Sequence, residues 1–294
     1  MQDNKKLVSV NLTLHNLALL LIRGLNFFIF AQILILVCMA LNTSLNPHVS
    51  VDCVIFGFNR DALRLLLIKR TVPNAVTELD DSYYALPGDL VNDSEDLNQA
   101  ASRVLHELTG LQGIYLQQFQ AFGDPTRISK PKDRSWLKGV RQDPDARVIT
   151  VAYMALIDSK KVVLQPGSFS KEAIWVPISE IPELAFDHNE IYESALAALR
   201  ERIQIQPIAF ELLPEKFTMA DLQSLYETIL ERDLDKRNFR RKMLNSGILL
   251  PLTEKQLGVS NKPARFYSYN RSIMEGSESQ YINLRMEGTF TLFQ

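Results

Sequence analysis

The pattern of hydrophobic and polar positions predicts a region rich in β-strands that begins near residue 48. Residues 49–58 and 63–69 are runs of β-branched and aliphatic residues, and residues 59–62 between them have a turn-forming composition. Two such runs joined by a short turn are typical of a β-hairpin. The same pattern predicts further strands over residues 114–122, 148–157 and 173–177.

Residues 97–108 carry the clearest helical pattern in the chain. Their apolar side chains recur three and four positions apart, which places them on one face of a helix. These side chains are Leu97, Ala100, Ala101, Val104, Leu105 and Leu108. We expect Asp93 or Ser94 to cap the N-terminus of this helix, and Gly110 lies just past its C-terminus.

Two segments between these elements are predicted as loops. Residues 71–84 and a glycine-containing loop after them lead into the helix, and residues 127–147 form a long polar stretch. The polar stretch carries the basic residues Arg127, Lys130, Lys132, Arg134, Lys138, Arg141 and Arg147. Connections longer than about 12–15 residues tend to be functional or mobile. A solvated surface loop is the alternative interpretation, and both stay open.

A second amphipathic helix, over residues 189–203, ends this first unit, and we interpret residues 203–214 as a linker because Pro207 and Pro214 interrupt it. A helix over residues 217–230, capped by Thr218, follows.

A basic helix comes next, over residues 236–244, and residues 245–247 close it. Residues 248–270 then resemble two strands around a loop. Two short helices followed by such a hairpin indicate a winged helix-turn-helix.

Composition excludes several classes of protein. The 294 residues are 46% hydrophobic and 22% charged, which rules out collagen-like, low-complexity and disordered chains and suits one large or two ordinary domains. The net charge of -2 means that nucleic-acid binding must come from a local basic cluster. Cys38 and Cys53 have no metal-type spacing and cannot form a framework of disulfides, so we expect a reducing compartment, the cytoplasm.

The N-terminal segment allows two interpretations. Residues 17–41 are almost entirely apolar, and an apolar segment of this length can anchor the chain in an inner membrane. Lys5 and Lys6 precede it, as positive charges often precede such an anchor. Alternatively, Met39 is the true start and residues 1–38 are translated upstream sequence. A membrane-tethered sensor depends on the first interpretation.

A set of residues around the first predicted helix resembles the Nudix signature. The set is Gly88, Glu95, Arg103, Glu107, Gly110 and Leu111. The resemblance covers residues 48–203 and implies an α/β/α sandwich, in which helix carboxylates hold Mg²⁺ at a diphosphate.

This chain departs from that signature at three positions. Val104 and Leu108 replace two family glutamates, and Glu95 lies one residue later than the family spacing. Of the helix carboxylates that hold metal, only Glu107 remains, so we expect no bound metal and negligible diphosphate hydrolysis. The structural interpretation of Glu107 is an ion pair with Arg103 four positions earlier. The alternative to a domain without hydrolysis is an active, Mg-dependent Nudix hydrolase that takes metal ligands from outside the helix, such as Glu95 or Asp124.

The second unit has the residues of a DNA-binding surface. Its second helix combines basic side chains with Phe239 and Met243, which can face inward, and Asn238 can pair with an adenine edge. The predicted DNA-binding residues are Lys236, Arg237, Asn238, Arg240, Arg241 and Lys242, with Lys262 and Arg265 in the wing.

Together the two units resemble the Nudix-related transcriptional regulators, the NrtR-like and AraR-like family. The fold class is therefore expected to be α+β: a Nudix sandwich with a C-terminal winged helix-turn-helix. The predicted divisions are an N-terminal segment over residues 1–47, a Nudix-like domain over 48–205, a winged helix domain over 206–275 and a tail over 276–294.

The resemblance also implies partners and a sensing site. Such regulators form homodimers on palindromic operators, and their Nudix domain senses ADP-ribose, a related nucleotide or a sugar such as arabinose. We expect the effector to contact Pro87, Gly88, Asp89, Arg103, Phe122, Arg147, Asp187 and His188. Arg103 and Arg147 suit a phosphate-bearing ligand, although arginines also anchor loops.

Overall fold

The structure is a computed structural model that describes residues 45–59, 62–71, 82–141, 143–161, 164, 172–256 and 263–270. The apolar segment 17–41, the alternative start at Met39 and the tail over 276–294 lie outside these residues. No helix in the described ranges is long and apolar enough to cross a membrane.

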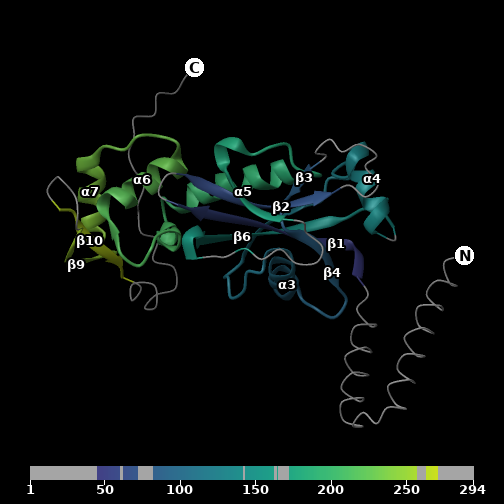
Figure 1. Cartoon of the computed structure of the whole chain (residues 1–294), viewed down its shortest axis with the longest axis horizontal. Helices are drawn as coiled ribbons and strands as arrows, with labels where there is room; N and C mark the ends of the chain where they lie inside the picture. Colours follow the sequence, from purple (N-terminus) through teal and green to yellow (C-terminus); the bar gives the residue numbers. More distant parts are fainter. Residues whose placement is uncertain are drawn as a thin grey trace, which may run out of the picture. The chain divides into compact units, whose positions relative to one another are not determined.

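A seven-stranded sheet forms the centre of the first domain (Figure 1). The strands are β1 (Leu45–Phe58), β2 (Leu63–Thr71), β3 (Ser82–Ala85), β4 (Gly88–Asn92), β5 (Gln117–Phe122), β6 (Ile149–Asp158) and β7 (Glu172–Pro177). β1 pairs in parallel with β6 and antiparallel with β2, which confirms the predicted hairpin.

Two helices cover opposite faces of this sheet. Alternate residues of β1 point to opposite faces. Val54 and Phe56 share one buried cluster with residues of α5 (His188–Arg202). Cys53 and Ile55 pack in another with residues of α3 (Leu97–Thr109). Figure 1 shows α3 and α5 on the two sides of the strands, so the predicted α/β/α sandwich is confirmed.

The N-terminus of α3 corrects one prediction. Asp96, and neither Asp93 nor Ser94, is the cap: its side chain accepts hydrogen bonds from the backbone N–H groups of Asn98 and Gln99. The Gln99 side chain accepts in return from the Asp96 N–H, which completes a capping box. Gly110 ends the helix as expected, with a left-handed φ of 78°.

Three other predictions in this domain were wrong. Part of the loop expected over residues 71–84 is strand β3, and the glycine-containing loop after it begins with strand β4. Both strands have five residues or fewer, too short for a hydrophobic period to identify. The strand expected from residue 114 begins at Gln117.

The polar stretch 127–147 was also misjudged, because it contains a helix. α4 (Pro131–Val140) begins with a proline, whose fixed φ suits the first turn. Asp133 and Leu137, four positions apart, are buried. One carboxylate and one leucine are too few to give an amphipathic signal. Short 3₁₀ turns, η1 (Ser159–Lys161) and η2 (Ile178–Glu180), flank β7 along the chain.

The second domain is a winged helix. Its elements are η3 (Pro207–Leu212), β8 (Phe217–Thr218), α6 (Met219–Leu230), α7 (Lys236–Asn245), β9 (Leu249–Lys255) and β10 (Arg265–Tyr269), and the three strands form a sheet in the order β8-β10-β9. Thr218 caps α6, as predicted, although the helix begins at Met219 because residues 217–218 pair with β10.

The predicted linker over residues 203–214 is part of a core. Ala209, Phe210 and Leu212 in η3 are buried. The Phe210 ring stacks on Tyr269 of β10 with a centroid distance of 4.7 Å, and it also contacts Phe217. Prolines therefore shape a packed 3₁₀ turn here instead of an exposed connection.

The capping box provides a stability test. Asp96→Ala removes the acceptor of two backbone N–H groups, so it is expected to lower the free energy of unfolding by about 1 kcal/mol. Ser94→Ala, the cap suggested by sequence alone, is the matched control and should change it by less than about 0.5 kcal/mol. Urea unfolding followed by circular dichroism measures both, and equal effects would contradict the observed cap.

Candidate functional site

A buried carboxylate on the central strand organises the first domain's polar site. Asp52 of β1 is buried, and its Oδ2 accepts a hydrogen bond from Thr150 Oγ1 at 2.7 Å. Arg127 Nη2 lies 3.6 Å from the same oxygen, and His188 Nε2 lies 3.4 Å from Oδ1. Burial acts to raise the pKa of Asp52, but His188, Arg127 and Thr150 outweigh it and hold that pKa well below its usual range.

Arg127 and His188 connect Asp52 to the start of α5. Arg127 donates to both oxygens of Asp187, from Nε and from Nη2, at 2.8 Å each. His188 Nδ1 accepts the backbone N–H of Leu86 at 2.9 Å, which places its proton on Nε2, toward Asp52. Two of the predicted effector residues, Asp187 and His188, therefore have structural partners inside this network.

The chain before β4 passes very close to the same carboxylate. The Cys53 N–H donates to the carbonyl of Pro87 at 2.8 Å. A Cβ at Gly88 would collide with Asp52 Oδ1, so only glycine fits there. Asp89, the next residue, is exposed, and its carboxylate accepts the N–H of Leu90. The structure thus brings Pro87 and Gly88 to the Asp52 network.

Helix α4 adds two ionisable groups that sequence reasoning missed as site residues. Asp133 is fully buried; its Oδ1 accepts the Phe186 N–H at 3.1 Å, and its Oδ2 has no hydrogen bond to a described residue. Burial raises the pKa of Asp133 to about 6. Phe186 itself has a left-handed φ of 55°, which is uncommon for a bulky residue.

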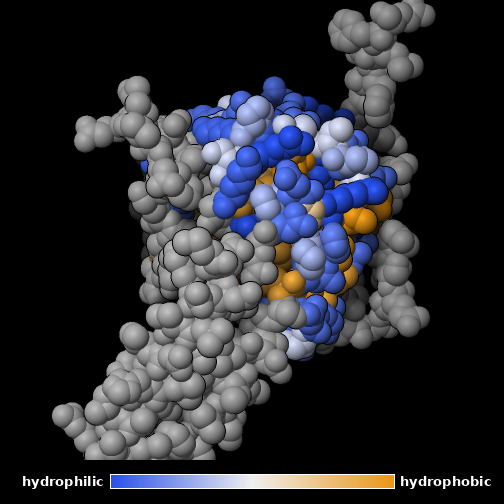
Figure 2. All heavy atoms as spheres, turned by 90° about the vertical axis from the view of Figure 1, so that its right-hand side faces the viewer, coloured by the Kyte–Doolittle hydropathy of each residue, from blue (hydrophilic) through white to orange (hydrophobic). Residues whose placement is uncertain are grey.

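Arg141, at the end of α4, is the second of these groups. Its Nη1 is buried and makes no hydrogen bond within the described part of the chain. Burial lowers the pKa of this guanidinium, whereas the nearby Asp89 and Asp52 act to raise it. The surface on the side of α4 is mainly hydrophilic, with small hydrophobic areas (Figure 2). The positive charge of the half-buried Arg141 beside this hydrophilic surface suits an anionic ligand.

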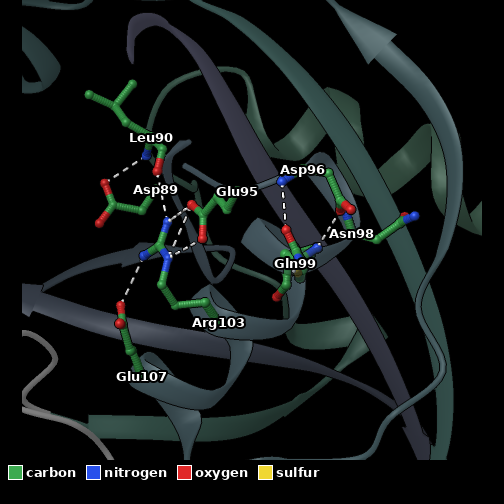
Figure 3. A network of polar contacts seen from close by, with 10 residues as sticks. Asp89, Leu90, Glu95, Asp96, Asn98, Gln99, Arg103 and Glu107 are labelled. Carbon is green, nitrogen blue, oxygen red and sulfur yellow. Dashed lines mark hydrogen bonds and ion pairs between the residues drawn. The ribbon is translucent and has the colours of Figure 1, made fainter. Parts of the chain in front are cut away.

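The remaining Nudix positions form a separate network on α3 (Figure 3). Arg103 donates to Glu95 through Nε and Nη2, at 2.9 and 2.6 Å, and to Glu107 through Nη1 at 3.0 Å. Its Nη2 also reaches the carbonyl of Leu90. The predicted pair of Arg103 and Glu107 is therefore present. A phosphate ligand of Arg103 would have to compete with these carboxylates.

Magnesium does not fit this helix as the described residues arrange it. The acidic side chains Glu95 and Glu107 both pair with Arg103, and Val104 and Leu108 are buried in the core against β1. No three His, Cys, Asp or Glu side chains among the described residues are grouped so as to hold a metal ion.

The last two predicted effector residues lie at one end of β5. Phe122 is buried there, and exposed Arg147 donates to the carbonyl of Gly123 at 3.1 Å. Sequence reasoning missed Asp52 and Thr150, although each is a polar residue inside an apolar strand run. That interruption was the available signal. Asp133 gave none, because α4 was not expected, and Arg141 was noted only as one of the basic residues of the stretch 127–147.

Helix α7 carries the predicted nucleic-acid interface. Phe239 and Met243 are buried, as expected, and α7 contains no acidic residue. Five of the predicted DNA-binding side chains on this helix are exposed, namely Lys236, Arg237, Asn238, Arg240 and Arg241. The sixth, Lys242, is half-buried. Arg265 is exposed at the start of β10, and Lys262 lies outside the described residues. The exposed surface of α7 is therefore strongly basic, although the net charge of the whole chain is slightly negative.

The buried Asp133 predicts a pH dependence of stability. Because its folded pKa is raised, the stabilisation from its protonated form is complete below about pH 4 and is lost as pH rises through about 6. Asp133→Asn keeps an acceptor for the Phe186 N–H and removes the titration. Relative to this variant, the wild-type free energy of unfolding should fall by up to about 3 kcal/mol across that range. Exposed Asp145→Asn is the control, and a pH-independent difference for Asp133→Asn would contradict the assignment.

Comparison with known proteins agrees with this architecture. The NUDIX domain model matches residues 46–199, and the model described as the NrtR DNA-binding winged helix domain matches residues 209–269. An ADPR responsive transcriptional repressor, NtrR, from Acinetobacter baylyi is 32% identical over 228 residues, which cover 76% of this chain and 82% of the relative.

An ADP-ribose pyrophosphatase from Methanocaldococcus jannaschii is 29% identical over 50% of this chain and 72% of its own length. The crystal structure of Shewanella oneidensis NrtR superposes with a TM-score of 0.58 at 26% identity, covering 76% of this chain and 94% of that one. The chain therefore belongs to the NrtR family, in which a NUDIX domain is joined to a DNA-binding winged helix domain.

Proposed function

We propose that this chain is a transcriptional repressor that binds operator DNA through its winged helix and releases it when ADP-ribose binds to the NUDIX domain. The observation that carries the proposal is α7, a helix with five basic side chains and no acidic one, anchored by Phe239 and Met243. A helix of this kind neutralises phosphates while it lies in the major groove. The similarity to a repressor described as ADPR responsive supports the same role.

The effector is proposed to contact the Asp52 network from the side of Arg141. ADP-ribose carries a diphosphate, and the half-buried guanidinium of Arg141 offers a positive charge to it. Of the predicted contacts, Gly88 and Asp89 lie on the same side, and Asp89 is among the charges that act on Arg141. A sugar such as arabinose would gain little from that guanidinium, so ADP-ribose is preferred to a sugar.

Release of DNA requires that the effector binds one arrangement of the protein more tightly than another. We propose a homodimer, because two winged helices on two half-sites explain a palindromic operator. Operator binding would place the protein in the cytoplasm. The alternative of an inner-membrane anchor depends on residues 17–41.

The NUDIX domain is proposed to act as a sensor without a cofactor. Diphosphate hydrolysis in a Nudix helix needs several carboxylates on Mg²⁺, and here Glu107 is paired with Arg103 while Val104 and Leu108 belong to the core. The second candidate is an active Mg-dependent hydrolase, which the similarity to an ADP-ribose pyrophosphatase favours.

The repressor proposal predicts salt-sensitive, effector-sensitive DNA binding. The full-length chain should bind the promoter DNA upstream of its own gene, and raising salt from about 50 to about 200 mM should weaken binding at least about tenfold. ADP-ribose should release the DNA, and arabinose should not. Fluorescence anisotropy of labelled duplexes measures each arm.

Two variants on α4 test the effector contact in the same assay. Arg141→Ala should raise the ADP-ribose concentration needed for release at least about tenfold, as loss of one charged hydrogen bond implies, without changing promoter affinity. Arg134→Ala is the matched control, since Arg134 lies on the same helix, is exposed, and donates its side-chain N–H to the carbonyl of Ile128. Release by arabinose alone would instead identify a sugar sensor.

The proposed loss of catalysis has its own test. Incubated with ADP-ribose and Mg²⁺, the protein should release no AMP or ribose 5-phosphate above the background without enzyme, as followed by chromatography. A known ADP-ribose pyrophosphatase serves as the positive control. Turnover that depends on Mg²⁺ and disappears in Glu107→Gln would establish the hydrolase.

A further inference from the structure

The orientation of α7 divides its cations into two groups. An α-helix turns by about 100° per residue. Phe239 and Met243 are 1% and 0% exposed, so their side of α7 faces the core of the domain. Arg241 follows Phe239 by two positions and precedes Met243 by two, which places it on the opposite, outward side. Arg237, two positions before Phe239, lies outward as well.

The other cations of α7 lie beside its buried side. Arg240 follows Phe239 directly and lies along one edge of the helix. Lys236 lies seven positions before Met243, on the same side as the buried residues, but it is exposed because it is the first residue of the helix. Lys242, directly before Met243, lies along the other edge and is half-buried. When the outward side of a helix faces the floor of the major groove, side chains along its edges face the two phosphate backbones.

Arg241 is held in place by a neighbour. Its Nη2 donates to Asn238 Oδ1 at 3.0 Å. Asn238 is fixed in turn at the start of the helix, where its backbone N–H donates to the capping carboxylate of Asp235 at 2.8 Å. A guanidinium has five N–H donors, so this bond leaves enough of them to bind O6 and N7 of a guanine together.

An exposed leucine continues the same side of the helix. Leu244 follows Arg241 by three positions and is 44% exposed. An apolar side chain makes no favourable contact with a charged phosphate, whereas it can pack against the methyl group that thymine presents in the major groove. The outward side of α7 therefore carries side chains that can bind base edges, whereas the side chains beside its buried side are cations that suit phosphates.

We infer that Arg241, positioned by Asn238, contacts a guanine in the major groove and determines which operator is bound, while Lys236, Arg240 and Lys242 bind phosphates. The inference rests on the proposed function, because it requires that α7 enters DNA. Asn238 then acts through Arg241 and not, as its amide alone suggested, as a contact to adenine.

Two matched substitutions test the assignment. Arg241→Lys and Arg240→Lys each keep the positive charge and remove a guanidinium. Arg241→Lys should lower the preference for promoter DNA over a shuffled duplex of equal composition by about tenfold or more, with unchanged affinity for the shuffled duplex. Arg240→Lys should leave the preference unchanged.

Dimethyl sulfate footprinting shows the contact itself, because the reagent methylates guanine N7 in the major groove. The wild type should protect one guanine in each half-site, and Arg241→Lys should lose that protection. Asn238→Ala should weaken protection of the same guanine, and Asn238→Asp, which keeps the oxygen acceptor, should restore it at lower overall affinity.

The outcomes separate the two proposals. Promoter binding by the wild type with no change in Arg241→Lys, or with equal losses in Arg241→Lys and Arg240→Lys, would overturn the assignment and leave the repressor intact. A wild type that shows no preference for promoter DNA would overturn the proposed function and the assignment with it.

Discussion

The first domain depends on how it accommodates one buried carboxylate. An ionised group in a protein interior is stable only when charges and hydrogen bonds replace its water. Around Asp52 these are supplied by Thr150 of β6, by Arg127 between β5 and α4, and by His188 at the start of α5. Segments far apart in the sequence meet at Asp52, so the contacts that stabilise its carboxylate also fix the ends of several elements.

The close approach of the chain to Asp52 explains a glycine that belongs to the Nudix pattern. Gly88 leaves room for the carboxylate, and the Pro87 carbonyl accepts the N–H of Cys53 beside it. The fold keeps this part of a Nudix domain, whereas α3 uses Val104 and Leu108 for packing. A frame that positions a ligand can thus persist after the residues that bind a catalytic metal have been replaced, as the proposed sensor role requires.

In the winged helix, the two buried residues Phe239 and Met243 determine which side chains of the basic helix α7 face outward. Phe239 contacts the ring of Tyr226 on α6 edge-on, at a centroid distance of 5.5 Å, and this packing fixes the rotation of α7. The same charges on a helix rotated by half a turn would lie against the core. Affinity for DNA follows from the number of cations, but discrimination between sequences follows from their angular placement.

The sequence by itself determined the two-domain organisation, the main strands and helices, the pair of Arg103 and Glu107, and the inward side of α7. All of these depend on local periodicity or on side chains within one turn of a helix. Tertiary structure alone decided the Asp52 network, the helix α4 and the packed turn η3. Their stabilising partners come from other parts of the chain, and a polar helix or a proline-bounded segment is buried only when such partners surround it.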